Sequence, residues 1–496
     1  MLSFLRGLFP EIPASAGMLV VPCSTLDIAQ RDTVRTVGLV VDAHLDANKL
    51  YQTLSMLIER KFPRVGARLA YRNRVYEFHI PRVFDSETPP VAFTAEEYRE
   101  PYLASCGARP DVLGLLNRTD SEPIFCQFPA LKMYLVSKTC PASTDEFIST
   151  KTPMLHVHVS VFDDLTLIGV TASEMMFDAP GLSTLLHAWT RVLSGDDIDD
   201  IPGMAWDLAP FNAFLGPSYL RCIRGRGYGS DRVAEYPMNM WKGSVYDPLI
   251  ELCQDRMRRQ KRAREVSQLV RIPKTFIEDR RLEVIEELKR KGFNEIVSSS
   301  DVLMAWWIKT SYRLRRPNDP TVLYLHMAAD LRPKAIFAGG SPLAQPFINN
   351  ASSTVCVPSL MHEILATSLG ELALGIRRTI SAYDADLPAS EELRWRNTHP
   401  MIRLEYCQWW NESAVQTSWS GLSGLDFSGA GRQGEKTSTQ GRVRFVFTDI
   451  VMAEEGEFLR GSGAILMEDA NAVWMSQVKW REEWEELRRS GLFKFV

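Results

Sequence analysis

Residues 166–195 read TLIGVTASEMMFDAPGLSTLLHAWTRVLSG, and this stretch joins an apolar run to an amphipathic helix through a short acidic turn. The continuous apolar residues over 165–172 predict a buried strand. The turn carries Glu174 and Asp178. A strand that runs directly into a helix is typical of an α/β fold, and functional side chains often lie at such junctions. The helix, expected over 182–193, has one apolar face made of Leu182, Leu185, Leu186, Trp189, Val192 and Leu193.

Similar patterns recur on both sides of this stretch. The alternation in HVHVSVF (156–162) predicts a strand with Val157, Val159 and Val161 on its core face. Strands and helices alternate in both halves of the chain, which predicts two α/β sandwiches. The other expected helices cover 47–61, 280–291, 298–313, 359–383 and 481–490, and the other strands cover 68–81 (a pair), 321–333, 441–450, 463–470 and 472–480.

The length of 496 residues is too great for one compact core and favours two or more domains. After Gly195 the composition becomes acidic and then rich in Pro, Gly and Arg. We interpret 196–265 as a long crossover between an N-terminal domain at 1–195 and a C-terminal domain at 266–496. A basic run at 256–264 fits either a solvated helix face or a site that attracts a phosphate-bearing ligand.

The composition is that of an ordinary globular protein, with 45% hydrophobic and 24% charged residues. A net charge of −4 argues against binding to nucleic acid or to an anionic membrane. The eight cysteines show no Cys-x-x-Cys spacing, so we expect free thiols, a reducing compartment and no metal. The stretch MLSFLRGLFPEIP is too short to span a membrane and lacks the layout of a signal peptide. These features predict a cytoplasmic protein.

Six segments carry a resemblance to a known family, in the family's order and over nearly the whole chain. They are KFPRVGARL (61–69), the stretch 166–195, SSSDVLMAWWIK (298–309), AADLRP (328–333), PFINNASS (346–353) and TSWSGLSGLDFSGAG (417–431). In them the chain resembles the BAHD acyltransferases, especially the fungal trichothecene-acetyltransferase-like branch. The resemblance implies two chloramphenicol-acetyltransferase-like α/β domains with a channel between them. It also implies a monomer without a bound cofactor, which takes acyl-CoA from one face and an acceptor alcohol or amine from the other.

The family signature is His-x-x-x-Asp-Gly, and this chain departs from it at the first position. Asp178 falls on the family Asp, Ala179 replaces the Gly, and Glu174 stands where the His is expected. In the family the His takes the proton from the acceptor, and the Asp pairs with an arginine that corresponds to Arg332. The resemblance therefore implies a structural pair of Asp178 and Arg332 beside an altered base.

Two further landmarks of the family are altered. The motif Asp-Phe-Gly-Trp-Gly is represented by DFSGAG, which keeps Asp426 as its structural residue. In PFINNASS the usual Gly is Asn349, although the Asn that follows is retained as Asn350. Acyl transfer also needs donors directed at the developing oxyanion. The resemblance offers four residues for contacts with substrate or oxyanion: Thr417, Ser418, Trp419 and Asn350.

Glu174 leaves three interpretations open. A carboxylate in water titrates at about 4.3 and is a weaker base than imidazole at neutral pH, although burial beside Met175, Met176 and Phe177 would strengthen it. Glu174 is then the general base of an O- or N-acyltransferase of secondary metabolism. In the second interpretation it serves a cyclase or isomerase that acts on a polyketide- or terpenoid-like intermediate without acyl transfer. In the third it is structural, in a ligand-binding protein without turnover.

The histidines outside the turn offer no clear substitute for the altered base. His156 and His158 share one face of a strand, and we interpret them as polar packing unless that face lines the channel. His187 lies among apolar residues of the helix after the turn, and His326 lies on a strand before Asp330.

Overall fold

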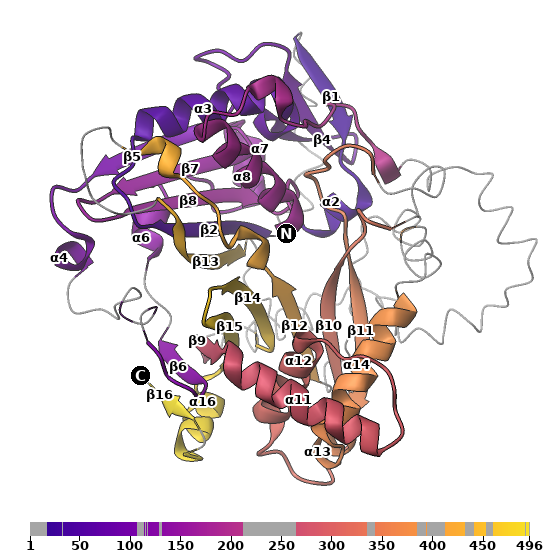
Figure 1. Cartoon of the computed structure of the whole chain (residues 1–496). Coiled ribbons are helices and arrows are strands. Elements are labelled where there is room, and N and C mark those ends of the chain that lie inside the picture. Colours follow the sequence, from indigo (N-terminus) through magenta and orange to yellow (C-terminus); the bar gives the residue numbers. More distant parts are fainter. Residues whose placement is uncertain are drawn as a thin grey trace, which may run out of the picture.

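Figure 1 shows the computed structural model of the chain. The described residues are 17–31, 33–106, 114, 116, 118–127, 131–211, 264–334, 343–383, 393, 412–431, 441–452, 460–491 and 493–495. Most of the expected crossover and nearly all of the basic run at 256–264 lie outside the described residues. Within the described part, no helix combines the length and the apolar character needed to cross a membrane.

A five-stranded sheet in the order β13-β2-β8-β7-β5 forms the centre of the N-terminal half. Helices α3 (Ala47–Lys61) and α8 (Ala179–Leu193) lie over one face (Figure 1), where Trp189 Nε1 donates to Thr53 Oγ1 at 3.0 Å. Their apolar stripes are buried in the core, as the periodicity predicts. The strands are β2 (Thr33–Val41), β5 (Ala92–Glu97), β7 (Leu155–Val161), β8 (Thr166–Ser173) and β13 (Val443–Met452).

An eight-stranded sheet in the order β11-β10-β12-β14-β15-β9-β6-β16 forms the centre of the C-terminal half. Helices α11 (Lys274–Arg290), α12 (Ser299–Tyr312) and α14 (Leu369–Tyr383) share a second hydrophobic core with it (Figure 1). Both halves are therefore α/β sandwiches, as predicted. The strands are β6 (Ile124–Gln127), β9 (Glu265–Pro273), β10 (Val322–Asp330), β11 (Ser352–Leu360), β12 (Glu412–Ser418), β14 (Ser462–Glu468), β15 (Ala472–Trp480) and β16 (Lys494–Phe495).

Shorter elements flank or connect the two sheets. A three-stranded sheet of order β1-β4-β3 consists of β1 (Met18–Pro22), β3 (Arg68–Arg72) and β4 (Val75–Pro81). Further helices are α2 (Thr25–Ala29), α4 (Tyr102–Cys106), α6 (Lys132–Leu135), α7 (Thr144–Thr150), α13 (Met361–Ala366) and α16 (Arg481–Arg489). The 3-10 turns are η2 (Pro63–Gly66), η3 (Ile198–Asp200), η5 (Ser420–Leu422) and η6 (Ser428–Ala430).

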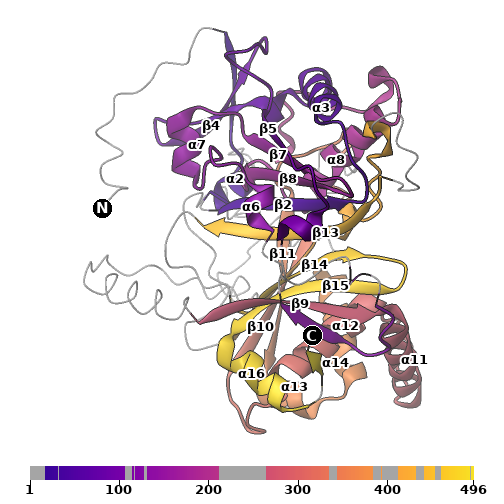
Figure 2. The same ribbon diagram turned by 90° about the vertical axis from the view of Figure 1, so that its left-hand side faces the viewer.

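Each half contributes one strand to the sheet of the other half. β13 pairs antiparallel with β2, and β6 pairs antiparallel with β9. Figure 2 shows β13 along the base of the upper lobe, next to the lower lobe. These two strands therefore cross the expected boundaries at residues 195 and 266, because strand partners far apart in sequence leave no local pattern. The boundaries of the two domains stay a prediction.

One expected helix was wrong in part. Residues 359–383 do not form a single helix, because 359 and 360 end β11 and the helical segment breaks between α13 and α14. Ser368 lies at the break, where its Oγ accepts a hydrogen bond from Glu371 N at 3.2 Å and caps a new helix. The helix expected at 298–313 is confirmed as α12, with Ser298 as its N-cap.

Candidate active site

The turn between β8 and α8 fixes Glu174 and Asp178 at its two ends. The backbone N–H of Glu174 donates to Thr33 O at 2.8 Å, which holds the end of β8 against β2. Asp178 is the N-cap of α8, and its Oδ1 accepts from Gly181 N at 2.9 Å. The residues between the two carboxylates are buried in the hydrophobic core: Met175, Met176 and Phe177.

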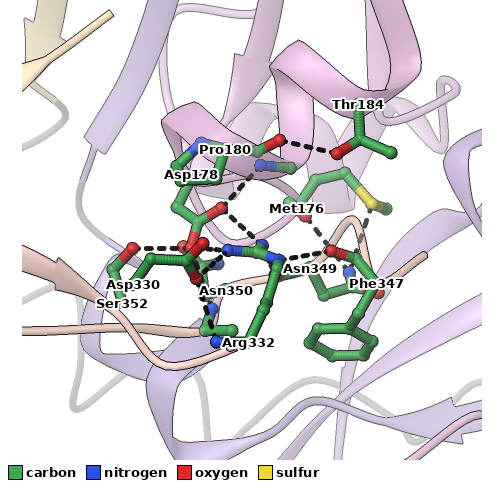
Figure 3. Close-up of polar contacts among 12 residues, drawn as sticks. Met176, Asp178, Pro180, Thr184, Asp330, Arg332, Phe347, Asn349, Asn350 and Ser352 are labelled. Carbon is green, nitrogen blue, oxygen red and sulfur yellow. Dashed lines mark hydrogen bonds and ion pairs between the residues drawn. The ribbon is translucent and has the colours of Figure 1, made fainter. Parts of the chain in front are cut away.

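Asp178 and Arg332 form the ion pair that the resemblance implies, with side chains exposed by only 9% and 13% (Figure 3). Arg332 Nη2 donates to Asp178 Oδ1 at 2.7 Å, and Nη1 donates to Oδ2 at 3.2 Å. Oδ2 also accepts from Ala351 N at 2.9 Å and from Ser352 Oγ at 2.7 Å. Burial by itself lowers the pKa of Arg332, but the charges and hydrogen bonds of Asp178 and Asp330 together outweigh burial and raise that pKa above its usual value. The pair thus joins the turn to the segment between β10 and β11.

Glu174 pairs with Arg35 of β2, a residue that the sequence patterns did not single out. Arg35 Nε donates to Glu174 Oε1, and the two side chains are exposed by only 13% and 16%. Glu174 Oε2 makes no hydrogen bond to any described residue. Glu174 therefore lies in an ion pair instead of the expected apolar setting, and one of its oxygens is left for another partner.

Trp419 covers this ion pair. The guanidinium carbon of Arg35 lies 5.2 Å from the centroid of the Trp419 ring, within the range of a cation–π contact. Trp419 is 5% exposed, and in the described part of the chain its indole N–H has no hydrogen-bond partner. An unpartnered buried donor is costly, so this N–H is a candidate donor to a bound ligand.

The other residues near Trp419 take supporting positions. Thr417 and Ser418 end β12 beside β14, and Ser418 Oγ lies 2.9 Å from Ser420 Oγ. Asp426 Oδ1 accepts from Ser428 N at 2.8 Å, which shapes the start of η6. Asp426 thus makes a local contact within its own motif, and Trp419 is the member of the TSW segment that contacts Arg35.

The side-chain amide nitrogen of Asn350, a residue expected to contact substrate or an oxyanion, makes its hydrogen bonds within the protein. Its buried side-chain amide donates to Glu174 O at 2.8 Å, to Met175 O at 3.1 Å and to Asp27 Oδ1 at 3.1 Å. Both amide hydrogens therefore have acceptors inside the protein. Asn350 thus supports the turn, and its contact with a substrate or oxyanion stays a prediction.

His156 lies away from the Glu174 carboxylate. Strand register places Arg35 opposite Ala172 and His156 opposite Thr171, so Arg35 and His156 lie on opposite faces of the sheet. His156 Nε2 lies 3.0 Å from Thr152 Oγ1, and burial lowers the pKa of His156 to about 4. His156 is thus a neutral packing residue. Among the described residues, no three His, Cys, Asp or Glu side chains are grouped so as to hold a metal ion.

Comparisons with known proteins cover nearly the full chain. No protein-family profile matches it. Acetyltransferase adrJ of Penicillium rubens is 25% identical over 481 residues, which span 90% of this chain and 89% of adrJ. The crystal structure of F. sporotrichioides TRI101 with coenzyme A and T-2 matches with a TM-score of 0.61 at 14% identity, over 95% of this chain and 97% of TRI101. Vinorine synthase matches with a TM-score of 0.57 at 15% identity, over 97% and 95% of the two chains.

Sequence relation and fold thus agree over almost the whole length. The chain is similar in sequence to fungal acetyltransferases such as adrJ and shares the fold of TRI101 and vinorine synthase. The family resemblance located Glu174, Asp178 and Arg332, but it did not indicate Arg35. The signal that could have found Arg35 is the strand pattern TVRTVGLVV (33–41), in which an arginine interrupts an apolar run.

Proposed function

We propose that this chain transfers an acyl group from acyl-CoA to a hydroxyl or amine of a small molecule in fungal secondary metabolism, as a cytoplasmic monomer. The relative adrJ is named an acetyltransferase, and TRI101 was crystallised with coenzyme A and T-2. The observation that carries the proposal is the ion pair of Glu174 with Arg35, because it presents a charged carboxylate at the position of the family base.

Glu174 Oε2 is the proposed proton acceptor. The acceptor oxygen or nitrogen attacks the thioester carbonyl carbon, its proton passes to Oε2, and the carbonyl electron pair moves onto oxygen. The resulting oxyanion collapses, the C–S bond breaks, and the CoA thiolate leaves and takes the proton back from Glu174. Arg35 holds the carboxylate in place through their ion pair before the attack and after CoA has left.

The indole N–H of Trp419 is the proposed oxyanion donor. It is buried beside Arg35, and no described residue accepts its hydrogen bond. A hydrogen bond to the oxyanion would satisfy this donor only when the reaction forms the negative charge, which is the pattern that lowers an activation barrier. Thr417 and Ser418 stay secondary candidates, since Ser418 is within hydrogen-bond distance of Ser420.

The test uses the purified full chain with acetyl-CoA and a panel of acceptors that includes deoxynivalenol, a phenol and a primary amine. Released CoA thiol and acetylated product should appear in equal amounts. Trp419→Phe should lower kcat about 100-fold, the usual effect of losing one oxyanion donor. Trp480→Phe is the matched control, because Trp480 also has a buried N–H without a described partner and stacks on Arg460 at 4.2 Å.

The same assay separates the alternative functions. Conversion of a polyketide- or terpenoid-like compound without CoA would assign the chain to cyclisation or rearrangement. Ligand binding without turnover, unaffected by Glu174→Gln, would assign it to a binding protein. Either result contradicts acyl transfer.

A further inference from the structure

Three consecutive backbone oxygens of the turn accept hydrogen bonds from two asparagine side chains, and Figure 3 shows the one between Asn349 and Met176. Asn350 Nδ2 donates to Glu174 O at 2.8 Å and to Met175 O at 3.1 Å. Asn349 Nδ2 donates to Met176 O at 3.2 Å. Both asparagines come from the segment between β10 and β11, so the C-terminal half is hydrogen-bonded to the turn of the N-terminal half.

The N-terminal half in turn holds each asparagine. Asp27 Oδ1 of α2 accepts from Asn350 Nδ2 at 3.1 Å and from Asn350 N at 3.2 Å. Arg64 Nη1 of η2 donates to Asn349 Oδ1 at 3.0 Å. Asp27 and Arg64 are each 3% exposed. Water therefore cannot readily replace these partners, and losing one asparagine leaves buried polar groups unsatisfied.

Asn349 stands where the family pattern has glycine. Glycine has no side chain, so it could make neither the contact with Met176 O nor the contact with Arg64. This chain therefore has a second side-chain amide, Asn349, next to Asn350. It also has Glu174 at the position of the family base. A shift of about 1 Å in a catalytic group costs about 100-fold in rate, so the direction of the glutamate carboxylate has to be fixed closely.

We propose that Asn349 and Asn350 are positioning residues: they clamp the backbone of the turn and thereby fix the direction of the Glu174 carboxylate beside Arg35. The inference deepens the proposed function and rests on it for its catalytic meaning. The clamp itself can be tested without acyl transfer, through the exchange of backbone amide hydrogens in the turn.

The test is hydrogen–deuterium exchange with mass spectrometry on the peptide that covers 172–178. Asn350→Ala and Asn349→Gly should each speed exchange there about tenfold or more, because each removes buried hydrogen bonds to the turn. The matched control is Gln477→Ala, which removes a buried amide that donates to Gln416 Oε1 at 3.1 Å in the other sheet. It should leave exchange over 172–178 unchanged.

Exchange at the wild-type rate in 172–178 would overturn the proposal. If Asn350→Ala does not fold, Asn349→Gly carries the test, because it restores the residue of the family pattern. With an acceptor that wild type converts, kcat should fall about 10- to 100-fold and KM for acetyl-CoA should stay within about twofold. A raised KM with unchanged kcat would make the asparagines binding residues and refute positioning. Faster exchange in a chain without acyl transfer would support the clamp and refute the proposed function.

Discussion

The ion pair of Asp178 and Arg332 allows a quantitative prediction that does not depend on the reaction. Asp178 accepts five hydrogen bonds: from Gly181 N, Ala351 N, Ser352 Oγ and two nitrogens of Arg332. Asp178→Asn keeps the size of the side chain and its N-cap oxygen but removes the charge. Arg332 would then remain buried without its main counterion, while its contact with the half-exposed Asp330 at 2.9 Å persists.

The expected cost follows from this arrangement. Removing one member of a buried ion pair costs about 3–5 kcal/mol of stability. Because Arg332 keeps its contact with Asp330, we expect Asp178→Asn to cost about 3 kcal/mol, the lower end of this range. Asp178→Ala also loses the helix cap, which adds about 1 kcal/mol. For a domain of about 200 residues that unfolds as a unit, a stability loss of about 3 kcal/mol lowers Tm by about 6–12 °C. Asp178→Ala should therefore unfold at a lower temperature than Asp178→Asn.

Scanning calorimetry at neutral pH measures these shifts. Asp46→Asn is the matched control, because Asp46 is also an N-cap aspartate, which accepts from Asn48 N and Lys49 N and has no ion pair among the described residues. Its Tm should change by less than about 2 °C, since Asn and Asp are comparable N-caps. If Asp178→Asn shifts Tm no more than Asp46→Asn, the pair does not hold the turn and the assignment of the structural residues fails.

Three more variants test other parts of the structure. Gly181→Ala should lower stability by about 1–3 kcal/mol in thermal unfolding, because the added Cβ would lie 1.9 Å from Ile348 O; a neutral or stabilising result would contradict this packing. The folded pKa of His156, about 4, lies below the unfolded value of about 6.5, so the neutral ring stabilises the fold above pH 6.5 and this contribution is lost as pH falls through 4. Between pH 6.5 and 4, the free energy of unfolding of His156→Gln should therefore fall by about 3 kcal/mol less than that of wild type in urea titrations. An equal fall in the two proteins would refute the role of burial. Arg35→Met should lower kcat about 10- to 100-fold with an acceptor that wild type converts, because Glu174 loses the partner that fixes its carboxylate; an unchanged kcat would show that Arg35 does not act on Glu174.

Local sequence patterns predicted the elements that depend on local interactions. The helix at 47–61 and the N-cap Ser298 follow from apolar periodicity and cap chemistry, which act within a few residues. The helix expected at 359–383 failed where Ser368 caps a new helix, since the apolar pattern continues through the break. Strand exchange by β6 and β13 could not be predicted, because pairing depends on partners more than 100 residues away in the sequence.

In the candidate site, too, some residues could be located from the sequence and others could not. Asp178 and Arg332 could be located through the resemblance, and the structure places them in contact. Arg35 could not be assigned to Glu174, because the two are separated by 139 positions and meet only through the pairing of β2 with β8. The contact of Asn350 with Asp27 spans 323 positions and likewise needs the folded chain.

The proton-accepting role of Glu174 is tested most directly by the acetyl-CoA-dependent rates of wild type, Glu174→Gln and Glu174→His with one acceptor. We expect Glu174→Gln to lose at least about 100-fold in kcat, the usual contribution of a general base. Glu174→His should recover part of that loss, because imidazole is a stronger base near neutral pH. A Glu174→Gln enzyme with the full wild-type rate would contradict the assignment of Glu174 as the base.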